Sequence, residues 1–365
     1  MHAERLSRLI EEAGAGGFDA LAVMPGPNLF YLTGMSFHLS ERPVLLFIPL
    51  DRPPALVAPG FEAVKADDVP FDVECFTYTD EEGYEAVFRR ACDGLGLSSC
   101  TIGAEAFKLR MVELRLLEQY ALGCQITPAE ETLAALRMRK DAHELAHMRR
   151  AIEMTEGALE ETREQIAAGM TERQVATILR AAILQRGGEG MAFGPAVQAG
   201  ANAASPHASP GDDEIQPGDT IVIDCGTLVN GYASDITRTF AVGEMGAEMT
   251  QVYEVVRAAN AAGRGAVRPG ISAQEVDRAA RRVIEQAGYG AYFNHRTGHG
   301  LGLEVHEPPY IVEGNERLLE PGMTFTVEPG IYLPGQGGVR IEDDVLVTAD
   351  GGESLTTFPR EFRPL

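Results

Sequence analysis

The chain has 365 residues, of which 45% are hydrophobic and 23% charged, a composition typical of a globular protein large enough for two domains. Its formal net charge is −23, and its only lysines are Lys65, Lys108 and Lys140. So acidic a chain is expected to bind neither nucleic acid nor an anionic membrane, whereas small substrates and multivalent cations remain compatible with it.

The five cysteines include no CxxC pair and no even disulfide framework, which favours a reducing compartment. The first residues, MHAERLSRLIEEAG, have the pattern of an amphipathic helix rather than that of a signal peptide. No apolar run approaches the ~20 residues of a transmembrane helix. These features predict a cytoplasmic enzyme without a membrane span.

The first third of the chain alternates helical and strand patterns and is predicted to form an α/β domain with a mixed sheet, residues 1–126. Helices are expected at 4–13, 82–92 and 111–120, and strands at 20–24, 30–33, 44–49, 55–58, 73–77 and 101–105.

A proline among acidic residues predicts a linker over 127–140, followed by a second domain over 141–365. Long helical patterns cover 142–167 and 171–186, the second with Thr171 as its N-cap. From Phe193 the chain becomes rich in glycine and β-formers, with further helices predicted at 249–263 and 273–287.

The stretch His143-Glu144-Leu145-Ala146-His147 matches the H-E-x-x-H pattern of zinc proteases. Charged residues flank it on both sides, and no third zinc ligand stands out downstream. We therefore interpret it as a solvated surface helix, with zinc hydrolysis as the alternative.

The segment 221–240 predicts a β-hairpin, because Asn230-Gly231 separates two β-rich runs. A tight turn there pairs Val229 with Tyr232 and Asp224 with Thr237. Asp235 then becomes a diagonal neighbour of Asp224. Two carboxylates directed at one buried point must share a proton or bind a cation, unless one caps a turn or pairs with Arg238.

The C-terminal third adds further polar side chains within apolar strands. His299 lies between two glycines, and His306 follows a strand-like run. Glu328 and Glu342 lie symmetrically about Gly335, so a hairpin closed there sets them opposite each other. Four carboxylates and one imidazole suit Mn²⁺, Co²⁺ or Zn²⁺ and carry enough charge for two ions, which could hold a bridging hydroxide and polarise an amide carbonyl.

These segments resemble the pita-bread metallopeptidases, the group of methionine aminopeptidase, Xaa-Pro aminopeptidase and Xaa-Pro dipeptidase (prolidase). The stretch Asn28-Leu29-Phe30-Tyr31-Leu32-Thr33-Gly34 is similar to the N-terminal domain of the prolidase, aminopeptidase P and creatinase branch. The resemblance implies an α+β fold class, with a C-terminal pita-bread domain and a smaller creatinase-like α/β domain. It also implies a homodimer. Five positions match the family's dinuclear ligands: Asp224, Asp235, His299, Glu328 and Glu342.

The resemblance also implies roles for other residues. His207 and His306 match histidines that hydrogen-bond the substrate or the tetrahedral intermediate, and Glu328 matches the proton shuttle. Arg340 resembles a position that helps to bind the carboxylate of a C-terminal proline. Tyr310 stands where some prolidases carry an arginine, and His38 is placed to reach a partner subunit's site.

Hydrolysis of the bond preceding proline in Xaa-Pro dipeptides, by a hydroxide that bridges two divalent ions, is the expected function. Manganese is the expected metal, with cobalt or zinc as alternatives, and the substrate is a small peptide with proline at P1′. The alternatives are Xaa-Pro aminopeptidase activity on longer peptides, a metal-free creatinase-like hydrolase, and a non-catalytic binding module. The last two are expected to have eroded ligand sets, whereas all five positions are retained here.

Overall fold

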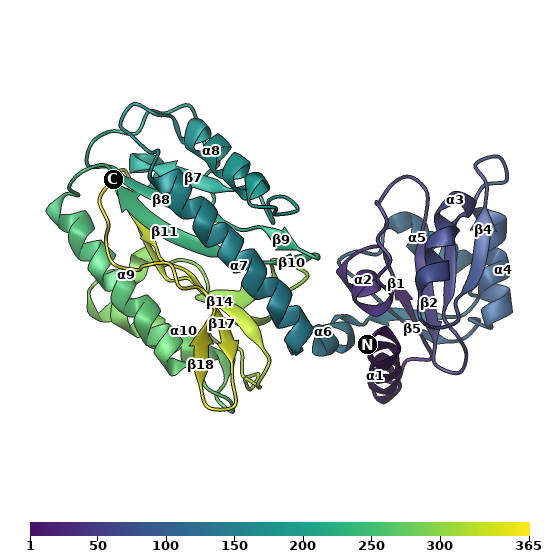
Figure 1. Ribbon diagram of the computed structural model, residues 1–365. Helices are drawn as coiled ribbons and strands as arrows, with labels where there is room; N and C mark the ends of the chain where they lie inside the picture. The colour runs from purple at the N-terminus through teal and green to yellow at the C-terminus, as the bar shows by residue number, and fades with distance from the viewer. The chain divides into compact units, whose positions relative to one another are not determined.

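The computed structural model describes residues 1–365 and divides the chain into two compact units, Met1–Arg137 and Met138–Leu365 (Figure 1). None of the helices combines the length and the apolar character needed to cross a lipid bilayer.

The first unit is built on one six-stranded mixed sheet with the order β4-β3-β2-β1-β5-β6, which confirms the predicted α/β domain. Its apolar core lies between this sheet and helices α4 and α5. The strands are β1 (Ala20–Val23), β2 (Leu45–Pro49), β3 (Ala55–Pro59), β4 (Glu74–Tyr78), β5 (Thr101–Ala104) and β6 (Gln125–Pro128). The helices are α1 (His2–Ala15), α2 (Pro27–Thr33), α3 (Gly60–Ala63), η1 (Val64–Asp68), α4 (Glu85–Leu95) and α5 (Met111–Tyr120).

The strand predicted at 30–33 is wrong, because these residues belong to helix α2. Pro27 occupies the first helical turn, and Gly34 ends the helix with φ of 78°. Proline in the first turn favours the start of a helix, and a left-handed glycine after the last turn ends it. They outweigh the β-propensity of the short aromatic and branched run between them.

The segment predicted as a linker, 127–140, contains the end of β6 and the helix α6 (Glu130–Met138). Pro128 is tolerated in β6 because this strand forms one edge of the sheet, where a missing N–H leaves no neighbouring strand unpaired. The border between the two units falls near the end of α6.

The second unit places two helix pairs against curved β-structure (Figure 1). The pair α7 and α8 packs on β7, β8 and β11, and the pair α9 and α10 packs on the strands that follow. The helices are α7 (Ala142–Arg163), α8 (Glu172–Gln185), η2 (Gly200–Ala204), α9 (Ala247–Ala266), α10 (Ala273–Gln286) and η3 (Gly290–Tyr292). The strands are β7 (Ala196–Ala199), β8 (Thr220–Cys225), β9 (Leu228–Val229), β10 (Tyr232–Ala233), β11 (Ile236–Ala241), β12 (Gly298–Gly300), β13 (Glu307–Ile311), β14 (Thr324–Val327), β15 (Gly330–Leu333), β16 (Gly337–Arg340), β17 (Asp343–Val347) and β18 (Gly352–Ser354).

Capping boxes start both helices of the first pair. Thr171 accepts a hydrogen bond from the backbone N–H of Gln174, whose side chain accepts one from the N–H of Thr171, so the predicted N-cap is confirmed. Asp141 and Glu144 form the same reciprocal arrangement at the start of α7.

The predicted hairpin at Asn230-Gly231 has the expected register. Val229 pairs with Tyr232, and Asp224 pairs with Thr237. Asn230 and Gly231 have φ of 48° and 76°, as a two-residue turn of this type requires. Asp224 lies near the end of β8, and Asp235 lies in the short break between β10 and β11.

The second hairpin also forms as predicted about Gly335. Gly330 pairs with Arg340, and farther from the turn Val327 pairs with Asp343. Glu328 and Glu342 lie between these two paired stretches and face each other across the ladder. Each hairpin therefore brings two acids to the middle of the unit.

A buried ion pair joins the residues just before α7 to the start of β13. The Nζ of Lys140 lies 2.7 Å from an Oε of Glu307, and the two side chains are 1% and 2% exposed. Breaking a buried pair by removing one partner leaves the other charge uncompensated in a medium of low dielectric constant.

We expect Lys140→Met to lower the free energy of unfolding by about 3 kcal/mol. The adjacent Arg139→Met is the matched control, because the pair of Arg139 with Glu320 is 57% and 52% exposed, and it is expected to cost at most about 1 kcal/mol. Urea denaturation followed by circular dichroism measures both, since the chain has no tryptophan. Equal losses of unfolding free energy in the two variants would contradict the stabilising role of the buried pair between Lys140 and Glu307.

Candidate functional site

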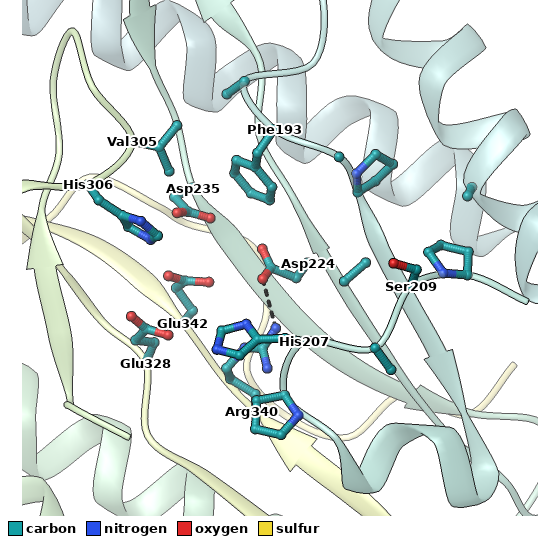
Figure 2. A pocket seen from close by; sticks show the side chains of 18 of the residues that line it. Phe193, His207, Ser209, Asp224, Asp235, Val305, His306, Glu328, Arg340 and Glu342 are labelled. Carbon is teal, nitrogen blue, oxygen red and sulfur yellow. Dashed lines mark hydrogen bonds and ion pairs between the residues drawn. The ribbon is translucent and has the colours of Figure 1, made fainter. Parts of the chain in front are cut away.

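A cavity of about 1200 Å³ in the second unit brings most of the predicted site residues together. Figure 2 shows the carboxylates of four of them directed into one space. The predicted residues that line it are Asp224, Asp235, His299, Glu328, Glu342, His207, His306 and Arg340.

The two aspartates come from the first hairpin. Asp235 is buried, and its backbone N–H donates to the side chain of Asp344 at 3.1 Å, which fixes the break in the strand that carries it. One oxygen of Asp224 and one of Asp235 are buried without any hydrogen-bond donor. Burial, followed by the charges of Glu342 and Asp224, raises the pKa of Asp235 well above its ordinary value.

The imidazole of His299 is oriented by its own backbone. Nδ1 lies 3.2 Å from the carbonyl oxygen of Gly300, which assigns the proton to Nδ1 and leaves the lone pair on Nε2. Nε2 lies 3.3 Å from Glu328 and 3.8 Å from Asp235. Burial, and then the neighbouring His306, lower the pKa of His299, so the ring is neutral. The flanking Gly298 is required, since a Cβ there would collide with the carbonyl oxygen of Thr326.

The two glutamates of the second hairpin are supported from both sides. Asn260 of α9 donates to the carbonyl oxygens of Val327 at 3.0 Å and Ile341 at 3.2 Å, the residues just before the glutamates. Thr237 donates to Glu342 at 2.5 Å. Burial, together with the charges of Glu328 and Asp224, raises the pKa of Glu342. Burial also raises the pKa of Glu328 to about 7.

The donor set fits divalent cations. Ligating atoms of Asp235, His299 and Glu342 all lie within 4.8 Å of one another. Orphaned carboxylate oxygens and a neutral imidazole with a free lone pair are the ligands that manganese, cobalt or zinc accept. The raised pKa values have the same origin, because carboxylates crowded in a buried space repel one another unless a cation is present.

Arg340 forms an ion pair with one of the four acids, Asp224, and it is nearly buried. Its guanidinium donates to Asp224 at 2.7 Å, to Tyr332 at 3.0 Å and to Thr237 at 3.1 Å. Three of its five N–H groups are thus used inside the chain. The Tyr332 hydroxyl continues the network to His295 at 2.9 Å. Neither this tyrosine nor this histidine was predicted from the sequence, where only the proximity of His295 to His299 hints at them.

The two predicted substrate histidines reach the cavity from different segments. His306 stacks edge-on against His299, with ring centroids 4.0 Å apart, and burial lowers its pKa. His207 comes from the exposed loop that follows η2. Figure 2 shows both rings at the margin of the acidic group.

Tyr310 and His38 do not line the cavity. Tyr310 is 38% exposed and lies under the guanidinium of Arg296, whose carbon is 4.5 Å from the ring centroid. Arg296 itself lines the cavity, and no carboxylate of the chain pairs with it. Sequence reasoning missed this arginine although it lies three residues before His299. His38 is an exposed residue of the first unit.

The H-E-x-x-H stretch lies on α7, away from the cavity. Glu144 is buried rather than solvated as expected, because it completes the capping box and accepts a hydrogen bond from Tyr232 at 3.0 Å. His147 stacks on the same tyrosine and contacts Asn230. The glutamate of the pattern is therefore occupied by structural contacts.

Comparison with known proteins agrees with this geometry. Residues 146–349 match metallopeptidase family M24, and residues 5–139 match the creatinase/prolidase N-terminal domain. A protein of Lactobacillus delbrueckii subsp. lactis named Xaa-Pro dipeptidase is 35% identical, over 100% of this chain and 99% of its own.

Two solved structures are similar along their whole length. A dipeptidase from Pyrococcus horikoshii OT3 is 40% identical with a TM-score of 0.94, covering 99% of this chain and 100% of its own. A prolidase from Thermococcus sibiricus is 34% identical with a TM-score of 0.95, covering 100% and 99%. The chain therefore belongs to metallopeptidase family M24, with a creatinase/prolidase N-terminal domain ahead of a pita-bread domain.

Proposed function

We propose that this chain is an Xaa-Pro dipeptidase, which hydrolyses the bond preceding proline with two divalent cations, manganese in the first place. The observation that carries the proposal is the convergence of Asp224, Asp235, His299, Glu328 and Glu342 in one cavity with two histidines at its margin. A relative named Xaa-Pro dipeptidase that aligns over the whole chain supports the substrate class.

The five converging side chains are the proposed ligands of the cation pair. When bound, such a pair supplies a hydroxide nucleophile near neutral pH and a Lewis acid for the scissile carbonyl. The same carboxylates would then be held ionised, since opposite charge favours the charged form.

Glu328 is the proposed general base and acid. Its side chain lines the cavity, and its ionised carboxylate can accept a proton there and return it. It takes the proton of the attacking water and delivers it to the prolyl nitrogen as the C–N bond breaks. His207 and His306 donate hydrogen bonds to the carbonyl oxygen as negative charge develops on it.

Arg340, Tyr310 and His38 remain the proposed substrate contacts. Arg340 retains two N–H groups beyond its contacts within the chain. We add Arg296 to this group, because its guanidinium stacks on Tyr310, faces the cavity and has no carboxylate partner in the chain. A dipeptide's free carboxylate would supply that partner. His38 acts across a homodimer, which light scattering of the purified protein tests.

An activity panel with counted metal tests the proposal. The apoprotein is loaded separately with Mn²⁺, Co²⁺ and Zn²⁺, and Ala-Pro, Leu-Pro and Met-Pro are compared with Ala-Pro-Ala and Ala-Ala. We expect two ions per chain, fast cleavage of the Xaa-Pro dipeptides, little cleavage of the other peptides, and loss of activity on chelation.

Three other outcomes of this panel would each indicate a different function. Faster cleavage of Ala-Pro-Ala would identify an aminopeptidase. Turnover that persists after complete metal removal would favour the creatinase-like mechanism. Absence of both metal and turnover would identify a binding module.

A further inference from the structure

We propose that Gln198 and Glu172 are positioning residues that hold the loop carrying His207 over the acidic cavity. The inference deepens the proposed function, because it rests on His207 contacting the substrate. The two side chains are completely buried, and each binds the backbone of this loop.

His207 needs such support because its ring has no hydrogen bond or ion pair within the chain. It lies in the segment 205–211, whose residues are exposed or half-buried and belong to no helix or strand. The position of the ring therefore depends on the backbone that carries it.

Gln198 forms hydrogen bonds with the backbone on both sides of His207. Its Nε2 donates to the carbonyl oxygen of Pro206 at 3.3 Å and to that of Ala208 at 2.9 Å. Both partners are acceptors, so the amide nitrogen, and not the oxygen, must face the loop. One side chain thus fixes the residues immediately before and after His207.

Strands β7 and β8 connect Gln198 to Asp224, one of the acids of the cavity. Gln198 lies on β7, where it pairs with Val222 of β8, and two residues earlier Ala196 pairs with Asp224. Gln198 is thus on a strand hydrogen-bonded directly to the one that carries a proposed metal ligand. The distance between His207 and that ligand is set by one pair of neighbouring strands.

Glu172 closes the base of the same loop. Its carboxylate accepts from the backbone N–H of Ala199 at 2.6 Å and from that of Gly211 at 2.7 Å. It also accepts from the side chain of Asn202 at 2.8 and 2.9 Å. A single carboxylate thus joins the two ends of the segment 199–211, and no cation pairs with it. The ends are held by Glu172 and the tip by Gln198.

A double-mutant cycle on the metal-loaded enzyme separates positioning from a general structural role. Gln198→Met keeps the length of the side chain and removes both donors. We expect it to lower kcat/KM about tenfold in the wild-type background, because the imidazole of His207 is displaced. When His207→Ala is already present there is no imidazole to displace, and the further loss should be less than about twofold. Gln216→Met is the matched control, since Gln216 makes the same kind of bond to the carbonyl of Glu214 at 3.1 Å, but on the exposed surface. It should leave kcat/KM unchanged.

Hydrogen exchange gives a readout that does not depend on activity. Gln198→Met should speed amide exchange in 205–211 and leave β8 protected, and Glu172→Gln should do the same from the base of the loop. Equal losses of kcat/KM with and without His207, or unchanged exchange in 205–211, would overturn the proposal. If His207→Ala alone leaves kcat/KM intact, the role of His207 in the proposed function fails, while the exchange result still decides whether Gln198 and Glu172 hold the loop.

Discussion

Replacing Glu328 by glutamine is expected to lower kcat by about 10²–10⁴-fold while the bound metal and KM stay close to those of the wild type. The amide keeps the shape of the side chain and one oxygen for a cation, but it cannot carry a proton between water and the prolyl nitrogen. The wild-type side chain is suited to this task because it is 15% exposed, enough to reach the cavity.

The electrostatic surroundings of Glu328 are compatible with its proposed role in moving the proton. Burial raises its pKa to about 7; the charge of Arg340 opposes the rise and that of Asp224 adds to it. For Asp235 and Glu342 burial is joined by neighbouring carboxylates, and both have pKa values well above the ordinary range. Without bound cations, the pKa of Glu328 thus lies in the neutral range in which general acid–base catalysis operates.

Stopped assays of Xaa-Pro hydrolysis and metal analysis of the same sample measure the effect of Glu328→Gln. Glu313→Gln serves as the control, because Glu313 is an exposed acid paired with Arg278 outside the cavity. Near-normal turnover of Glu328→Gln with both ions retained would reject the proton-transfer role. Loss of metal together with turnover would show that the side chain acts as a ligand only.

The sequence predicts those parts of the site that depend on local hairpin geometry. The register of the first hairpin follows from the positive φ that Asn230-Gly231 supplies, and that register places Asp224 opposite Thr237. The second hairpin follows from the symmetry of Glu328 and Glu342 about Gly335. Strand pairing has a period of two, so a turn located to the residue fixes which side chains share a face.

Contacts that join distant segments could not be predicted in this way. Arg296 has no sequence pattern of its own, and its lack of a carboxylate partner appears only once every acid has been placed. The network from His295 through Tyr332 to Arg340 joins the segment before β12 to the second hairpin. The short helix α2 was missed for a different reason, because its apolar run is equally compatible with a strand and only its end residues decide.

Removing the carboxylate of Asp343 is expected to cause the largest loss of stability, about 5 kcal/mol for Asp343→Ala. Asp343 directly follows Glu342, and the alternation of a strand turns its side chain away from the cavity. There it meets Arg238 at 2.8 Å, Arg360 at 2.8 Å and Arg264 at 3.3 Å. The aspartate is completely buried and Arg238 is 1% exposed, so the substitution leaves several guanidinium groups without a counter-charge.

The pH dependence of this stabilisation has a definite sign. Burial alone would raise the pKa of Asp343, but Arg238, Arg360 and Arg264 outweigh it and hold the pKa below its ordinary value. The unfolded chain therefore takes up the proton first as the pH falls, and the contribution of the carboxylate is complete above about pH 5 and lost progressively below it. The stability gap between wild type and Asp343→Ala should be constant from about pH 5 to 8 and should narrow under more acidic conditions.

Denaturation curves followed by circular dichroism across this pH range test both statements. Asp343→Asn should fall between wild type and Asp343→Ala, because the amide oxygen still accepts hydrogen bonds from Arg238 and Thr356 but carries no charge. The exposed Asp350→Ala, in the turn before β18, is the matched control and should change the free energy of unfolding by less than about 0.5 kcal/mol. If Asp343→Ala were as stable as this control, the arginines would be sufficiently solvated without the aspartate. The segment that carries Glu342 would then be held by the hairpin, by Asn260 and by its bonds to Thr237 without help from Asp343.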